Sequence, residues 1–267
     1  MTADLPELAE GNFYYQALGG GRFRSTIHAQ GAWNAHEQHM APASGLMAEA
    51  LERHEPRADL RMARLSYEIL GLIPGGEFQI ETTTLRPGKT IELVQAELVA
   101  GGRTAIRGTA WRMVTSDTSG VAAVEDQTIP GPDECKPYDG SAVWPGGFIR
   151  SLEMRVAEGH RPGAGKVWLR TEHPLTDQAD SGDTARLMGL VDTANGIAAR
   201  VPPGKDSYAF PNLDLQIHMY RRPGGEWLGL DNAVSFGRDG IGLTSTVLHD
   251  RQGPFGRAEQ ILTLRRT

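Results

Sequence analysis

The sequence predicts an α+β fold built from two similar halves, each with one long helix packed against an antiparallel sheet. An internal repeat indicates the two halves, because RLSYEILGLIPGGEF (64–78) aligns with LDLQIHMYRRPGGEW (213–227) at an offset of 149 residues. Each half also reads as a helix followed by long strands with turns of hairpin length. This period far exceeds that of solenoid repeats, so a duplicated domain is the better interpretation.

Length and composition agree with two globular domains. The chain has 267 residues, of which 39% are hydrophobic and 22% are charged, and domains of about 150 residues would make it two. The net charge of −6 argues against a broad surface for nucleic acid or membrane, although a local arginine cluster can still bind a phosphate. The expected partners therefore include neither nucleic acid nor membrane.

The cysteine content and the N-terminal segment favour a cytoplasmic protein. Cys135 is the single cysteine, which excludes an internal disulfide and a zinc site made of thiolates. Residues 1–15 lack the basic and apolar regions of a signal peptide, and no apolar run approaches the roughly 18 residues of a membrane span. We expect a protein without a metal or redox cofactor.

Residues 1–115 are predicted to form the first domain. Two short strands within 13–33 surround a Gly-Gly-Gly turn, and a phosphate-binding loop is disfavoured because a strand rather than a helix follows. Residues 40–54 carry apolar residues at a helical spacing, and Pro42 suits the first turn of a helix. The strands expected next, bounded by Pro-Gly and Gly-Gly turns, span 61–73, 77–86, 90–100 and 103–115.

The same pattern restarts after a segment that reads as a linker. Residues 116–147 are rich in Gly, Pro, Ser and Asp and show no clear period. The second domain is expected over 148–267, with a helix from about 183 to 200. Its predicted strands lie near 148–156, 165–173, 209–221, 226–236, 240–249 and 256–265.

The two helices differ at one position that matters for chemistry. When HMAPASGLMAEAL is aligned with DTARLMGLVDTAN, Ala48 falls opposite Asp192. A carboxylate within an apolar helix is costly to desolvate unless it is hydrogen-bonded or used. Exposure of Asp192 to solvent at the edge of the helix would also explain a carboxylate at this position. Because Ala48 shows that the fold does not require a carboxylate there, we favour a functional role.

Several segments, in this order and spacing, resemble the double-hotdog acyl-CoA thioesterases, the acyl-CoA thioesterase II-like and thioesterase-like superfamily. They are TLRPGKTIELVQAEL (84–98), LEMR (152–155), VWLR (167–170), GLVDTANG (189–196), PNLDLQIHMYRRPGGEWL (211–228) and AEQILTL (258–264). The resemblance implies a double hotdog, with two antiparallel sheets each wrapped around a long central helix.

The same resemblance implies a catalytic trio. The family's Asp falls on Asp192 and its Gln on Gln260, while the position of its Thr or Ser is occupied by Asn212. An amide can hold a water by hydrogen bonding but cannot supply a nucleophilic hydroxyl. We therefore expect Asp192 to orient and deprotonate a water, or to attack directly, with both amides holding that water.

Four further residues are candidates for binding the substrate. His39 stands at the start of the first helix, where the resemblance places the edge of the partner half's site. Arg86 is one of several arginines suited to the phosphates of coenzyme A, and Ser235 falls opposite it in the repeat. Asp214 lies on a polar strand face. Solvated charges on a sheet surface explain these residues equally well.

The function that the resemblance implies is hydrolysis of an acyl-CoA to a carboxylic acid and free coenzyme A. A non-catalytic protein that binds acyl-CoA or a lipid-like ligand is the alternative that Asn212 raises. A hotdog hydratase is a second alternative, for which we expect an Asp/His pair on one helix, and 184–199 contains no His. Acyl-CoA is the expected partner, and the resemblance favours a homodimer.

Overall fold

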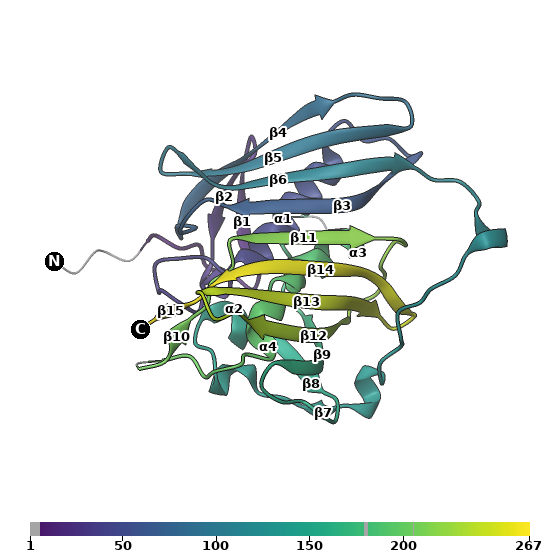
Figure 1. Ribbon diagram of the computed structural model, residues 1–267. Coiled ribbons are helices and arrows are strands. Elements are labelled where there is room, and N and C mark those ends of the chain that lie inside the picture. The colour runs from purple at the N-terminus through teal and green to yellow at the C-terminus, as the bar shows by residue number, and fades with distance from the viewer. Residues whose placement is uncertain (1–5, 179–180, 205) are drawn as a thin grey trace.

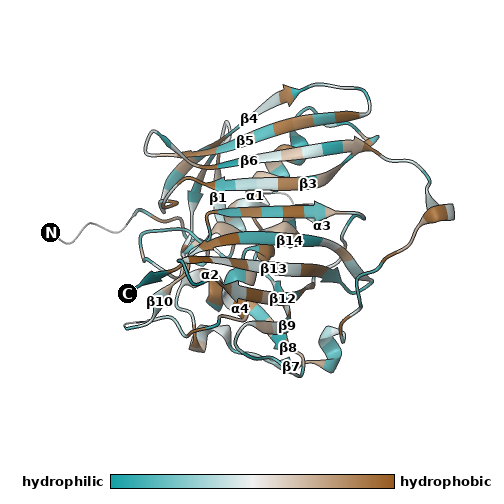
Figure 2. Ribbon diagram, viewed as in Figure 1, coloured by the Kyte–Doolittle hydropathy of each residue, from teal (hydrophilic) through white to brown (hydrophobic). Residues whose placement is uncertain are grey.

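The repeat in the sequence is also a repeat in space. In the computed structural model, which describes residues 6–178, 181–204 and 206–267, three consecutive strands of the first half correspond to three of the second half. These are β4 (Glu77–Arg86), β5 (Ile91–Ala100) and β6 (Arg103–Val114), matched by β12 (Leu228–Phe236), β13 (Ile241–Asp250) and β14 (Gly253–Thr263). In Figure 2, apolar and polar residues alternate along these strands, as the period of two in a half-buried sheet requires.

Strand pairing corrects the offset of the repeat from 149 to 150 within the sheet. Val94 pairs with Ala110, and Thr244 pairs with Gln260 in the same way. The buried Leu65 likewise corresponds to the buried Leu215. An offset of 149 would align inward-facing residues with outward-facing ones, because side chains alternate along a strand.

The two halves do not form separate sheets, which corrects the prediction of two. One 13-stranded sheet runs in the order β1-β2-β4-β5-β6-β3-β11-β14-β13-β12-β9-β8-β7. β3 (Leu60–Ile69) and β11 (Asp214–Met219) join the halves as antiparallel neighbours, with Ser66 opposite Gln216. Pairing these two edges satisfies backbone groups that separate sheets would leave open. The sheet curves around the helices, which lie behind it in Figure 1.

The remaining elements lie at the edges of this sheet or in connections. The predicted hairpin is present as β1 and β2, but the predicted strand from 148 begins only at 152, because a short helix precedes it. The bounds are β1 (Tyr15–Gly19), β2 (Arg22–Ser25), η1 (Ile27–Ala29), η2 (Ser119–Val121), η3 (Pro132–Glu134), β7 (Lys136–Pro137), η4 (Gly140–Ala142), α2 (Gly147–Arg150), β8 (Leu152–Val156), β9 (Ala164–Thr171), β10 (Tyr208–Ala209) and β15 (Arg265–Arg266).

Two helices cross at the centre of the molecule. α1 (Met40–Arg53) and α3 (Asp183–Val191) meet where Gly45 and Gly189 face each other. A Cβ atom on Gly45 would lie 2.6 Å from the Cα of Gly189, so this approach requires glycine. The offset of 144 between these glycines is also the offset between Ala48 and Asp192.

The second central helix is shorter than predicted, because it breaks at the functional candidate. α3 ends at Val191, and α4 (Ala194–Ile197) follows after a tight turn. The Thr193 N–H donates to Leu190 O at 3.2 Å, three residues earlier rather than four. The break turns the chain so that Asp192 lies at the end of α3. Within the described residues, no helix has the length and apolar character that crossing a membrane requires.

Candidate active site

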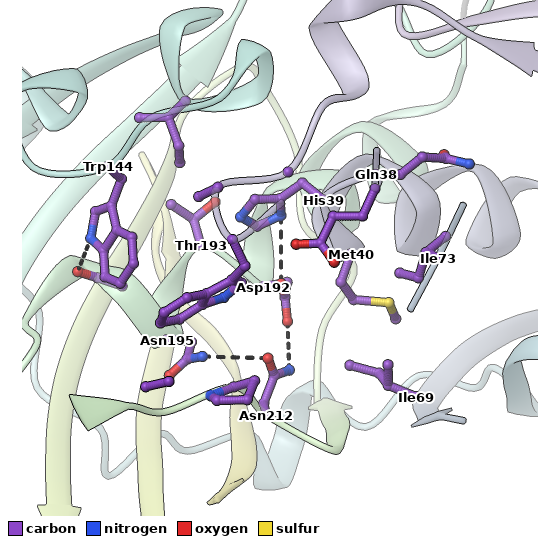
Figure 3. A pocket seen from close by; sticks show the side chains of 18 of the residues that line it. Gln38, His39, Met40, Ile69, Ile73, Trp144, Asp192, Thr193, Asn195 and Asn212 are labelled. Atoms are coloured by element: carbon purple, nitrogen blue, oxygen red, sulfur yellow. Dashed lines mark hydrogen bonds and ion pairs between the residues drawn. The ribbon is translucent and has the colours of Figure 1, made fainter. Parts of the chain in front are cut away.

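A cavity of about 460 Å³ opens where the two halves meet. Its walls come from the segment that leads into α1, the end of β3, parts of residues 138–154, the break between α3 and α4, residues 209–213 and Arg265 (Figure 3). Much of the lining is apolar, including Met40, Ile69, Ile73, Trp33 and Trp144. A largely apolar cavity with a few polar groups is the usual form of a small-molecule site.

Asp192 is the buried carboxylate of this cavity. Its side chain is only 6% exposed, and its Oδ1 accepts hydrogen bonds from Asn212 Nδ2 and Gln260 Nε2, each at 2.8 Å. Burial raises the pKa of Asp192 to about 6, against the opposing effect of the two amide hydrogen bonds. The structure thus brings together the three residues that the sequence predicted as catalytic.

The sequence predicted that the two amides hold a water. In the structure both donate to the carboxylate of Asp192 instead. Asn212 Nδ2 also donates to Asp214 O at 3.0 Å, so both of its amide hydrogens are used. Gln260 is 1% exposed, and its N–H contact is to Asp192. Their geometry fixes one oxygen of Asp192 and leaves Oδ2 for other contacts.

Asn195 extends this network and was missed by the sequence analysis. Its Nδ2 donates to Phe210 O at 3.1 Å and to Asn212 Oδ1 at 3.4 Å. Because a backbone carbonyl only accepts, the first contact fixes which way the Asn195 amide faces. The available signal was its position three residues after Asp192, which places both on one side of a helical turn.

His39 reaches the same carboxylate from the other half of the molecule. Its Nδ1 lies 3.6 Å from Asp192 Oδ2 (Figure 3), beyond hydrogen-bonding distance. It is the N-cap of α1 and accepts from the Ala41 N–H at 3.0 Å. Burial lowers the pKa of His39 to about 3, so the ring is neutral and carries its proton on Nε2.

The other three substrate-binding candidates do not line the cavity, although the Asp214 carbonyl contacts Asn212. Arg86 Nη1 donates to Ile91 O at 2.9 Å, and the guanidinium lies over the Trp111 ring. Asp214 Oδ1 accepts from the Ile261 N–H at 2.7 Å, and Ser235 is exposed on β12. None of the three is among the described residues that line the cavity.

Comparison with protein families decides the affiliation. The acyl-CoA thioesterase N-terminal domain matches residues 29–113, and the acyl-CoA thioesterase C-terminal domain matches residues 132–264. The chain belongs to the acyl-CoA thioesterase family. Asp192, Asn212 and Gln260 lie within the C-terminal match and His39 within the N-terminal one, so both domains of this thioesterase-family chain contribute to the cavity.

Solved structures with the same fold are similar at low sequence identity. A hotdog-fold protein of unknown function from Alicyclobacillus acidocaldarius has a TM-score of 0.73 at 13% identity and covers 94% of this chain and 96% of its own. Acyl-CoA thioesterase II TesB2 from Mycobacterium marinum gives 0.66 at 15%, with 96% of each chain covered. A CurJ dehydratase of curacin polyketide synthase gives 0.53 at 13%, covering 94% and 95%. No curated protein matches the chain.

Proposed function

We propose that the protein hydrolyses an acyl-CoA thioester to a carboxylic acid and free coenzyme A. The observation that carries the proposal is Asp192, a buried carboxylate with a pKa raised to about 6, held by two amides inside a cavity between both domains. A pKa close to the working pH gives a general base both the ionised form and enough basicity.

The geometry supports one sequence of steps. Asp192 Oδ2 accepts a proton from a water as that water attacks the thioester carbonyl carbon. The first N–H of α1, on Met40, has no carbonyl four residues earlier within the helix, and Met40 lines the cavity. This N–H, with the positive end of the helix dipole, would stabilise the oxyanion. The thiolate leaves and takes the proton from Asp192. Direct attack by Asp192 to form a mixed anhydride is the other route.

A second candidate function is hydration or dehydration of an acyl thioester. The proximity of His39 to Asp192 favours it, because an Asp/His pair is expected in a hotdog hydratase, although here the two residues come from different helices. One structural neighbour is a dehydratase. The bond from the Ala41 N–H to His39 Nδ1 occupies the nitrogen that faces Asp192, so only Nε2 of this ring is left for proton transfer. Non-catalytic binding of acyl-CoA is the third candidate function.

One screen separates the three. Release of free thiol is measured across saturated acyl-CoA chain lengths, and loss of enoyl absorbance is measured with unsaturated ones. Thiol release in the wild type, reduced in Asp192→Asn, supports the thioesterase. Loss of enoyl absorbance without thiol release would transfer the function to a hydratase, and binding without either reaction would show a ligand-binding protein.

A further inference from the structure

One arginine lies directly on the cavity that holds Asp192. Arg265, on β15, is the sole arginine or lysine among the described residues that line it, and its side chain is exposed. Its strand pairs with β10, where Arg265 is opposite Ala209, another lining residue. Backbone pairing therefore fixes the Arg265 backbone beside the cavity, with its exposed side chain at the rim.

A second arginine reaches the same mouth from the first half. Arg103 Nη2 donates to Leu72 O at 2.8 Å, and a Cβ atom on Gly71 would lie 2.8 Å from Arg103 Nη1. Gly71 and Leu72 both line the cavity. The guanidinium of Arg103 is thus fixed against the rim, and the absence of a side chain on Gly71 leaves room for it.

Both guanidinium groups retain donors for a ligand, although Arg103 Nη2 is already bonded to Leu72 O. Within the described part of the chain neither has an ion-pair partner, whereas Arg107 pairs with Glu97 and Arg221 pairs with Asp250. Apart from Asp192, the acidic residue of the cavity lining is Glu37, whose carboxyl accepts hydrogen bonds from nearby backbone N–H groups. Two free cations at the mouth of a cavity are notable in a chain of net charge −6.

We propose that Arg265 and Arg103 bind a phosphate group of the thiol that carries the acyl chain, an inference that rests on the proposed function. Guanidinium groups bind phosphate oxygens through paired hydrogen bonds. The acyl thioester then lies inward at Asp192 while the phosphorylated end of the carrier stays at the rim. The chemistry is that of phosphopantetheine, whether it belongs to coenzyme A or to a carrier protein.

The test compares acyl-CoA with the acyl-pantetheine of the same acyl group, which lacks phosphate. We expect wild-type kcat/KM to favour acyl-CoA by about tenfold or more, the scale of a charge-assisted hydrogen bond. Arg265→Gln and Arg103→Gln should lower this preference toward unity, because kcat/KM falls more for acyl-CoA than for acyl-pantetheine. Arg86→Gln makes the same change of charge away from the cavity and should keep the preference. A wild-type preference retained in both variants at the rim would overturn the proposal.

Binding separates failure of this site from failure of the proposed function. If the wild type hydrolyses no thioester, calorimetry with free coenzyme A and with pantetheine still tests the arginines. If Arg265→Gln binds coenzyme A about tenfold more weakly than the wild type but binds pantetheine equally well, the phosphate site is supported even without hydrolysis. Equal coenzyme A affinities in the two proteins would reject the site. Comparing kcat/KM for acyl-phosphopantetheine, acyl-CoA and an acylated carrier protein then shows whether the phosphate belongs to coenzyme A or to a carrier protein. The preferred substrate carries the phosphate that the arginines recognise.

Discussion

The cavity around Asp192 has a counterpart in the other half of the repeat, and the two have diverged. With offsets of 150 in strands and 144 in helices, Asn212 corresponds to Met62 and Met40 to Thr184. The cavity has a volume of about 460 Å³, whereas its counterpart retains about 10 Å³. Residues around that remnant are Glu52, Arg61, Met62, Thr184, Met219, Arg222 and Pro223.

The polar trio has apolar equivalents in the closed counterpart. Ala48, Met62 and Ala110 occupy the positions of Asp192, Asn212 and Gln260, and they are 0%, 5% and 0% exposed. The same fold therefore packs these positions without any polar atom. The fold therefore does not require polar residues at these positions, and the trio in one half indicates a functional role.

A carboxylate at position 48, in the half whose cavity is closed, tests most strongly whether the two halves differ in this way. Ala48→Asp should lower the free energy of unfolding by about 3–5 kcal/mol, because the new charge is buried without the amide donors that Asp192 has. Chemical denaturation at pH 7 measures the loss, and Ala48→Asn provides the uncharged control. An unchanged midpoint together with increased turnover would show instead that the second half holds a latent site.

Removing the carboxylate from the open half should abolish most turnover. Asp192→Asn keeps the shape of the side chain but cannot accept a proton, so kcat should fall roughly 100-fold or more, the usual scale for a general base. Steady-state kinetics measure it, with thermal melting as the control for folding. Wild-type turnover in this variant would place the base elsewhere.

The same substitution should change how stability depends on pH. Because burial raises the folded-state pKa of Asp192 to about 6, its protonated form stabilises the fold below pH 3.8, and this contribution is lost as pH rises through about 6. Asn does not titrate, so Asp192→Asn should gain up to about 3 kcal/mol relative to the wild type between pH 4 and pH 7. A stability difference that is constant over this range would refute the raised pKa.

Substitution of Asn212 tests the finest difference between the halves. The family resemblance implies Thr or Ser at this position, and a Thr hydroxyl can still donate to Asp192 Oδ1. We expect Asn212→Thr to leave kcat within a few-fold of the wild type or to raise it. Asn212→Met, which copies the closed half, is the matched comparison and should reduce kcat. Equal activities in the two variants would mean that donation to Asp192 is unimportant.

Local patterns in the sequence predicted much of this arrangement. The strands alternate with a period of two, and the helix over residues 40–54 appears as α1 within one residue of its predicted end. Pairing between β3 and β11 could not be predicted this way, because it depends on which sheet edges meet rather than on either strand alone. The break after Val191 was hidden because the apolar spacing continues through Ala194 and Ile197.

The site was predictable in chemistry but not in its contacts. Asp192, Asn212 and Gln260 were found from the repeat and the family resemblance. The role of the two amides could not be predicted from the sequence, because it depends on which way each amide group faces. Arg265 and Arg103 lie on separate halves and carry no motif, so only the folded chain shows that both reach the mouth of the cavity.

The pH dependence of kcat/KM tests most directly whether Asp192 is the catalytic base. We expect the activity of the wild type to rise with pH through an apparent pKa of about 6 as Asp192 ionises. His39, with its pKa lowered to about 3, does not titrate in this range. The residual activity of Asp192→Asn should show no such limb. An identical limb in wild type and Asp192→Asn would show that Asp192 is not the base, because the titrating group would then be a different one.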